Sequence, residues 1–475
     1  MSARKPMKKS IATLVLSLTL SIPTIGWGLD LRLPDMGNAV DRTLSPEEEV
    51  ALGEAFFARL RQQADFIDDP LVLSYTRDLG QRLAAATGFT TFEFQFEVIN
   101  DPTINAFVVP GGFVGINSGL FLLAENESEL AGVIAHEIAH GIQRHTARMF
   151  AGQGMNNLTA LAGIVGAVLL SSVSPDAATA AATAGVAGAA QSQINFTRAH
   201  EYEADRIAIQ ILQKAGIDPR GMVSFFEKMQ RREVAGSPMN QLSYLRTHPL
   251  TSERIAEAQA RVENLPKTFS GSVNSLEFNL AQARISVLTQ RAPTQPLPEI
   301  AAQYREALLK LKARQYEAAQ KALESLAERH PGLLWFELPL AQSIHDAGDY
   351  HKADQKLASL EKLYPDNSQI ILQRAQWAIE AGDPQKALNL TSRALRSRSD
   401  DPLLYLAQSR AAKAAGNMLL HYESLGRYFM QKRRLVAAHQ EFRKAYPYSA
   451  NDPIAQQRIE ASLTHIERIL KPDEE

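Results

Sequence analysis

The spacing of apolar and polar residues predicts a mainly α-helical chain with one small β-region near its start. Residues 45–62 and 71–85 each follow a helix-starting signal, Ser45 with Pro46 in the first case and Asp69 with Pro70 in the second. Residues 92–99 alternate between apolar and polar in the period of a strand, and residues 106–109 and 112–116 predict two more strands around a Pro-Gly-Gly turn. These strands predict a small sheet in which an edge strand could hold an extended peptide; a purely structural hairpin is the alternative.

A buried helix is predicted next. Residues 126–129 (Asn-Glu-Ser-Glu) precede an apolar run and have the form of a helix N-cap with an acid at the third helical position. The following turns are largely apolar, so polar groups on them need partners. His136 and His140 lie in this run.

The two histidines, four residues apart, project from the same side of the helix and can converge on one metal ion. This His-Glu-x-x-His spacing usually binds zinc. Glu137 points about 100° around the helix from its neighbour His136, so its carboxylate lies beside the ion and can take a proton from metal-bound water. The alternative is a surface helix with two solvated histidines.

A third ligand is predicted from a later helix over residues 194–214. Glu201 and Asp205 are separated by four residues and share one face. Glu201 can bind zinc, while Asp205 can support a ligand histidine or assist proton transfer. Glu203, on another face, is predicted to be a solvated acid.

His248 lies in a predicted loop over residues 245–250 and has two alternative roles. It can stabilise the developing oxyanion, or it can fill the fourth position of a resting zinc site, which catalysis needs open. An unreactive loop histidine is the third alternative. His145 and His200 are predicted to be structural, with His200 pointing away from the metal face.

Two apolar segments indicate where in the cell the protein acts. Residues 11–22 follow four basic residues and are too short for a membrane span, so residues 1–28 are predicted to be a signal peptide, with an uncleaved anchor as the weaker alternative. Residues 158–190 are uncharged apart from Asp176 and rich in small residues. They are predicted to form a lid over the cleft, with peripheral membrane contact as the alternative.

Repetition dominates the last third of the chain. Tyr316 and Tyr350, and likewise Ala319 and Ala353, are each 34 residues apart, and Gly348, Gly382 and Gly416 continue the period. This is the tetratricopeptide repeat length. We expect a protease domain over residues 29–270, a helix and proline-rich linker over residues 271–299, and repeats with a capping helix over residues 300–475. Such α-solenoids form concave surfaces that bind peptides or proteins.

The amino-acid composition limits the kinds of binding partner and of metal ligand that the chain can have. The chain carries 50 Lys and Arg against 52 Asp and Glu, so its charge balance does not favour nucleic-acid binding or a polybasic membrane anchor. It contains no cysteine, which leaves His, Glu and Asp as metal ligands.

Taken together, these motifs resemble the HtpX and CAAX-prenyl-protease type of gluzincin zinc peptidase over residues 44–265. The resemblance implies an α+β metalloprotease domain with one zinc ion bound by His136, His140 and Glu201, with Glu137 as general base and Asp205 at the family's acidic position. His248 is implied either as a further ligand or as oxyanion support. The motifs that carry it, besides the two histidines and the acids of the later helix, are Asn105-Ala106-Phe107, Pro110-Gly111-Gly112, Arg144-His145 and Thr247-His248-Pro249.

With the signal peptide and the repeats, the chain resembles the beta-barrel assembly-enhancing proteases of Gram-negative bacteria over nearly the full mature sequence. That resemblance implies a periplasmic endopeptidase that degrades misfolded or stalled outer-membrane proteins, assists their assembly, and contacts the barrel-assembly machinery through its repeats. The rival hypothesis is a non-proteolytic chaperone or adaptor in which zinc is structural. Glu137 separates the two, because a structural zinc site has no use for a carboxylate beside an open position.

Overall fold

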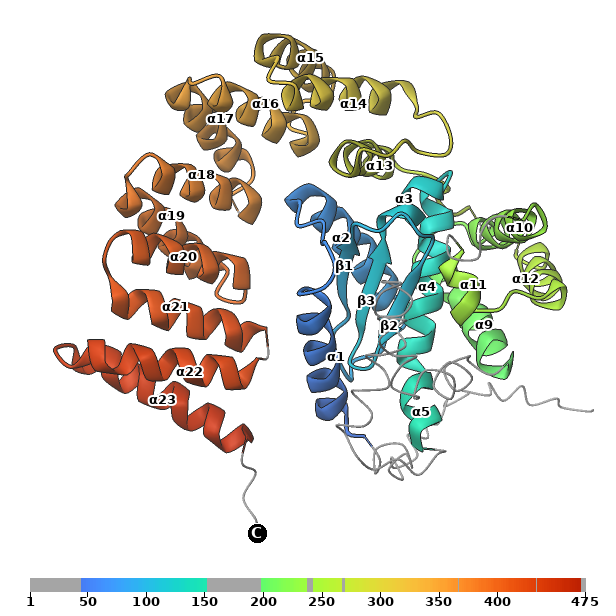
Figure 1. Cartoon of the computed structure of the whole chain (residues 1–475), viewed down its shortest axis with the longest axis horizontal. Helices are drawn as coiled ribbons and strands as arrows, with labels where there is room; N and C mark the ends of the chain where they lie inside the picture. The colour runs from blue at the N-terminus through green and yellow to red at the C-terminus, as the bar shows by residue number, and fades with distance from the viewer. Residues whose placement is uncertain are drawn as a thin grey trace, which may run out of the picture. The chain divides into compact units, whose positions relative to one another are not determined.

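The computed structural model describes residues 44–151, 198–236, 242–266, 270–365, 367–432 and 434–470 (Figure 1). The predicted signal peptide and the apolar segment 158–190 lie outside the described residues, so both remain predictions. No helix in the described part of the chain is long and apolar enough to cross a membrane.

Two helices and a three-stranded sheet begin the described fold. α1 (Pro46–Leu60) starts with a capping box between Ser45 and Glu48, and α2 (Pro70–Ala85) starts where Asp69 accepts a hydrogen bond from the backbone of Val72. The strands β1 (Gln95–Ile99), β2 (Ala106–Val109) and β3 (Phe113–Asn117) have the order β1-β3-β2. β1 pairs with β3 in parallel and β2 pairs with β3 antiparallel, so β2 is an edge strand of this sheet.

The first predicted strand is shorter than expected because it begins at Gln95, three residues after Phe92. The turn between β2 and β3 explains the Pro-Gly-Gly sequence. Gly111 and Gly112 both have φ of 81°, a left-handed conformation that L side chains rarely adopt. A Cβ at Gly111 would also lie 2.5 Å from the backbone of Val50 in α1. The turn is therefore held tightly against α1.

The predicted buried helix is α4 (Glu127–Ile142), which follows the short α3 (Ser118–Leu123). The Asn126 side chain accepts a hydrogen bond of 3.0 Å from the backbone of Glu129, as predicted. α4 packs against β2 on one side and against α9 (Arg198–Lys214) and α10 (Arg220–Val234) on others. This surrounds α4 with protein, so its polar side chains lie in the interior.

Shorter helices complete this part of the fold: α5 (His145–Ala151), α11 (Ser243–Thr247) and α12 (Ser252–Glu263). The expectation that residues 245–250 form a loop was partly wrong, because Leu245 to Thr247 belong to α11 and His248 follows at its end. α12 packs against α9 and α10, which brings its side chains toward the face of α9 that carries Glu201 and Asp205.

From α13 onward the chain is a series of helices that stack one after another (Figure 1). The helices are α13 (Leu276–Thr289), α14 (Glu299–Lys312), α15 (Tyr316–Arg329), α16 (Leu334–Asp346), α17 (Tyr350–Leu363), α18 (Ser368–Glu380), α19 (Pro384–Ser397), α20 (Pro402–Ala414), α21 (Met418–Gln431), α22 (Leu435–Ala445) and α23 (Pro453–Leu470), with a 3-10 turn over Tyr446–Ser449.

The 34-residue period corresponds to real structural positions. Ala319, Ala353 and Ala387 have no exposed surface, since paired helices touch there, and Gly348 and Gly382 have φ of 95° and 78° between helices. The fold is thus mainly α-helical with a small sheet, a peptidase part followed by helical repeats, as the sequence predicts.

A single core of buried apolar residues continues from α2 through α13 to α18. α13 packs against α2 and α3, and Arg284 of α13 forms ion pairs with Asp69, the N-cap of α2. The backbone of Thr294 in the proline-rich segment donates a hydrogen bond of 2.8 Å to Leu122. The repeats therefore begin on a helix that is fixed to the peptidase part. The domain bounds at residues 270 and 300 remain predictions.

Candidate metal centre

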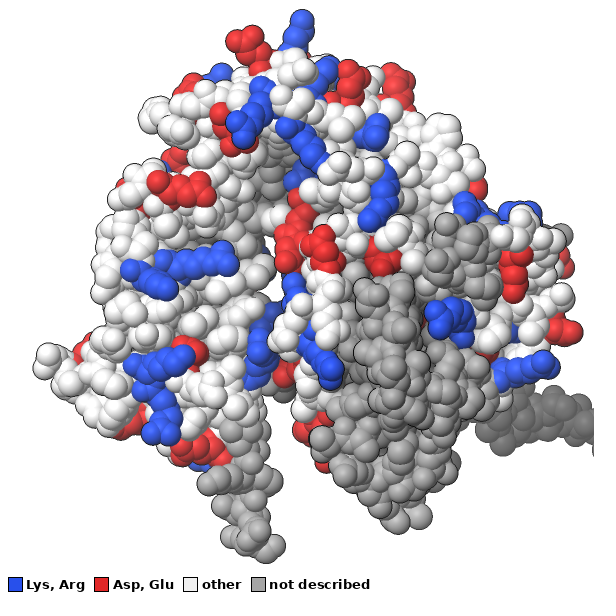
Figure 2. Space-filling model, viewed as in Figure 1, with Lys and Arg blue, Asp and Glu red and all other residues white. Residues whose placement is uncertain are grey.

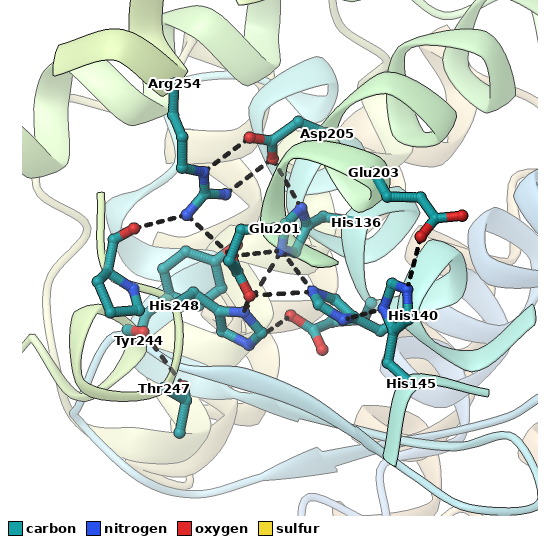
Figure 3. A network of polar contacts seen from close by, with 12 residues as sticks. His136, His140, His145, Glu201, Glu203, Asp205, Tyr244, Thr247, His248 and Arg254 are labelled. Atoms are coloured by element: carbon teal, nitrogen blue, oxygen red, sulfur yellow. Dashed lines mark hydrogen bonds and ion pairs between the residues drawn. The ribbon is translucent and has the colours of Figure 1, made fainter. Parts of the chain in front are cut away.

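Four buried side chains from three parts of the chain point at one another: His136 and His140 from α4, Glu201 from α9, and His248 after α11 (Figure 3). One potential ligand atom of each lies within 4.8 Å of those of the others. All four side chains are almost fully buried. The two histidines and Glu201 are thus brought together as the spacing predicts, and His248 joins them.

The separations of these atoms fit a tetrahedral metal ion. Metal–nitrogen and metal–oxygen bonds of about 2.0–2.1 Å place tetrahedral ligand atoms about 3.3 Å apart. The observed separations are 3.0 Å between the Nε2 atoms of His136 and His140, 3.4 Å from His136 Nε2 to Glu201 Oε2, and 3.4 Å from His140 Nε2 to Glu201 Oε1. His248 Nδ1 lies 3.4 Å from His136 Nε2 and 3.0 Å from Glu201 Oε1. The residues therefore fit one metal ion, with His248 at the fourth vertex.

Glu137 lies next to this cluster. Its Oε1 atom is 3.4 Å from His248 Nε2, and the side chain is 1% exposed. Burial raises the pKa of Glu137, while the nearby His248 and His136 and a backbone hydrogen bond at Val108 act in the opposite direction. Val108 belongs to β2, so the carboxylate is held between the cluster and the edge strand. A carboxylate of raised pKa in this position suits a group that takes and returns a proton.

Asp205 and Arg254 contact two members of the cluster, His136 and Glu201, and position their side chains. Asp205 Oδ1 lies 3.0 Å from His136 Nδ1, and Arg254 donates to both Asp205 oxygens at 2.7 and 2.8 Å. Arg254 also lies 2.8 Å from Glu201 Oε2. Burial lowers the pKa of His136, but the hydrogen bonds with Asp205 and Glu201 and the negative charges of these two residues together outweigh it and raise this pKa to about 9. Of the two roles expected for Asp205, this geometry favours the support of a ligand histidine.

A second supporting contact reaches His140. His145 Nδ1 lies 2.8 Å from His140 Nδ1, and its Nε2 lies 3.3 Å from Glu203 Oε2. His200 stacks on His145 with ring centroids 4.3 Å apart. Glu203 was expected to be a solvated acid, and this expectation was only partly right, because the carboxylate is partly exposed and also contacts His145. His145 is structural in the specific sense that it orients a ligand of the cluster.

His248 is positioned by Tyr244, one turn earlier. The Tyr244 ring stacks on the His248 ring at 4.8 Å between centroids, and the His248 backbone donates a hydrogen bond of 2.9 Å to the Tyr244 carbonyl. Burial raises the pKa of the Tyr244 hydroxyl well above its usual value, so the phenol stays neutral. The end of α11 thus presents the imidazole to the cluster.

Sequence comparisons place this chain among known proteases. Residues 72–262 match the family described as Peptidase family M48. The beta-barrel assembly-enhancing protease of Escherichia coli is 36% identical over 430 residues, which cover 86% of this chain and 86% of the relative. This chain belongs to that family of metalloproteases. The beta-barrel assembly-enhancing protease of Yersinia pestis is 34% identical, and the alignment covers 82% of this chain and 84% of the relative.

Other metalloproteases are similar to a shorter part of this chain. The mitochondrial metalloendopeptidase OMA1 of Schizosaccharomyces pombe is 30% identical over 197 residues, which cover 40% of this chain and 52% of that protein. The protease is therefore a metal-dependent peptide-bond hydrolase. The tetrahedral cluster and the carboxylate beside it form its candidate active site.

Proposed function

We propose that this protease is a periplasmic zinc endopeptidase that cleaves misfolded or stalled outer-membrane proteins and assists their assembly. The observation that carries the proposal is the buried His136–His140–Glu201 set with Glu137 beside it. The names of its relatives support the link to barrel assembly.

We assign one zinc ion per chain to His136, His140 and Glu201. Two imidazoles and a carboxylate, with no thiolate in a chain that lacks cysteine, are a donor set typical of zinc. When bound there, zinc supplies a water of lowered pKa and polarises the scissile carbonyl. Glu137 takes the proton of the attacking water and returns it to the leaving amine.

The edge strand β2 is the proposed binding site for the substrate backbone. Glu137 contacts the backbone at Val108, so this strand borders the cluster. An unfolded chain that adds to the outer edge of β2, a strand whose four residues are buried in this structure, has its backbone aligned beside Glu137. A folded barrel has no unpaired strand to offer, which accounts for a preference for unfolded or stalled substrates.

The test is cleavage of one barrel protein in two states. The purified chain with zinc is expected to cut the urea-denatured barrel soon after dilution and to leave the same barrel intact once it has folded in detergent micelles. Equal cleavage of both states would contradict the proposed preference. Absence of cleavage in both would favour the alternative, a chaperone or adaptor with a structural metal.

His248 provides a prediction about regulation. Its Nδ1 atom takes the fourth vertex of the cluster, the position that catalysis needs open. We expect His248→Ala to raise the basal rate of casein cleavage about tenfold. This corresponds to a free energy of about 1.4 kcal/mol by which His248 favours the closed metal site in the wild-type chain. A steady-state rate against the wild-type chain measures it.

The matched control for this prediction is His330→Ala, which changes a histidine between α15 and α16, outside the cluster. It is expected to leave the rate unchanged. A fall in the rate of His248→Ala would instead assign His248 to oxyanion support.

A further inference from the structure

A separate pocket lies in the repeats, between α19, α20, α21 and α23. Its volume is about 240 Å³. Its charged lining consists of Arg396, Arg427, Arg458 and Glu423, so two positive charges are in excess. In Figure 2, the visible face of the C-terminal helices carries both Lys or Arg and Asp or Glu side chains.

Glu423 holds two of these arginines in place, and its single negative charge neutralises only one of their two positive charges. Arg458 donates two hydrogen bonds to its carboxylate, at 2.6 and 2.7 Å, and Arg427 lies 3.2 Å from the same group. One buried carboxylate therefore serves two guanidinium groups. Both arginines remain partly exposed, with side-chain exposures of 35% and 43%. Each keeps N–H donors for an added anion.

Arg396 supplies the third positive charge. It is an exposed residue of α19 at the pocket, and no ion pair to it is found among the residues that the structure describes. An anion in the pocket would therefore gain a cation that has no competing carboxylate.

The rest of the lining is not charged. Leu395, Leu420 and the largely buried Tyr405 provide an apolar surface, and a buried hydrogen bond of 2.8 Å from Ser424 to Gln408 lies behind it. The pocket is smaller than the roughly 300–1,000 Å³ of sites for drug-sized molecules. It therefore fits a small group that is apolar at one end and anionic at the other.

We infer that this pocket binds the C-terminal carboxylate of an extended polypeptide whose last side chain is apolar. Arginine forks match a carboxylate geometrically, and the chain terminus carries its charge beside its final side chain. Capture of a terminal carboxylate is an established mode of peptide recognition. The inference rests on the proposed function in one respect: it identifies the captured chain with a substrate of the protease.

The experiment measures binding, and its protein is the full chain with Glu137→Gln, so that no peptide is cut. Three fluorescein-labelled decapeptides are compared by fluorescence anisotropy: one ends in Phe with a free carboxylate, one is its C-terminal amide, and one is an amide with Asp before the final Phe. We expect the free acid to bind at least about tenfold more tightly than either amide, as loss of a charge-assisted hydrogen bond implies.

Substitutions provide the matched controls. Arg396→Gln is expected to weaken binding of the free acid about tenfold, while Arg410→Gln, which removes an exposed arginine of α20 outside the pocket, leaves it unchanged. Glu423→Gln removes the competing anion and is expected to tighten binding severalfold, provided that its thermal melt matches that of the parent. An increase of this kind is not expected from damage to the fold.

Equal binding of the free acid and its amide would overturn the inference, as would lack of binding by all three peptides. Equal binding of the Asp-containing amide would assign the pocket to internal acidic residues and would also overturn it. Because anisotropy does not depend on cleavage, failure of the proposed proteolysis leaves these outcomes readable.

Discussion

Glu137→Gln is expected to lower kcat/KM for an unfolded substrate about a thousandfold, because a positioned general base contributes about 10²–10⁴ in rate. The amide keeps the size of the carboxylate, but it replaces one acceptor oxygen with an NH2 donor and cannot take a proton. Glu137 is not among the four side chains that converge on the metal position, so metal content is expected to stay the same. Casein cleavage and metal analysis on the same preparations measure both effects.

The matched control is Glu47→Gln, which changes an exposed acid in the first turn of α1. It is expected to cleave at the wild-type rate. If Glu137→Gln cleaved casein as fast as the wild-type chain, proteolysis at this cluster would be excluded, and the adaptor hypothesis would take its place.

Arg254→Met is expected to lower the free energy of unfolding by about 3–5 kcal/mol, the usual cost of removing one partner of a buried ion pair. Arg254 is 2% exposed and contacts both Asp205 and Glu201. Burial raises the pKa of Asp205, but the hydrogen bonds and charges of Arg254 and His136 together outweigh it and hold this pKa below its usual value. Without the guanidinium, two buried carboxylates lie close together with one positive partner fewer. Urea unfolding of the metal-free chain, followed by circular dichroism, measures the change.

Arg261→Met, on the same helix, is the control. Arg261 is 41% exposed and pairs with Glu257 near the surface, so its loss is expected to cost at most about 1 kcal/mol. Equal unfolding midpoints for the two variants would show that Arg254 does not compensate the buried acids.

The parts of the site that the sequence predicts are those set by spacing within one helix. His136 and His140 face one way because they are four residues apart on α4, and the same argument pairs Glu201 with Asp205 on α9. The helices themselves could be predicted from capping residues, as at Ser45 and Asn126. The repeats could be predicted from their period.

The parts that were missed depend on contacts between distant segments. Arg254 looks like an ordinary residue of an amphipathic helix, and only the packing of α12 on α9 places it against Asp205 and Glu201. α11 has five residues, which are too few for a periodic pattern. The stacking of its Tyr244 ring on His248 was therefore not predicted. His145 does carry a local signal: five residues after His140, it falls on a new helix that turns back toward the ligand.

The central claim is that His136, His140 and Glu201 hold one metal ion in a chain that hydrolyses peptide bonds. Metal content per chain, measured by mass spectrometry after gel filtration for the wild type and Glu201→Ala, tests it most directly. We predict one zinc per wild-type chain and a large loss in Glu201→Ala, with Glu203→Ala retaining the metal. An unchanged zinc content in Glu201→Ala, or a wild-type chain that takes up no metal, would contradict the account.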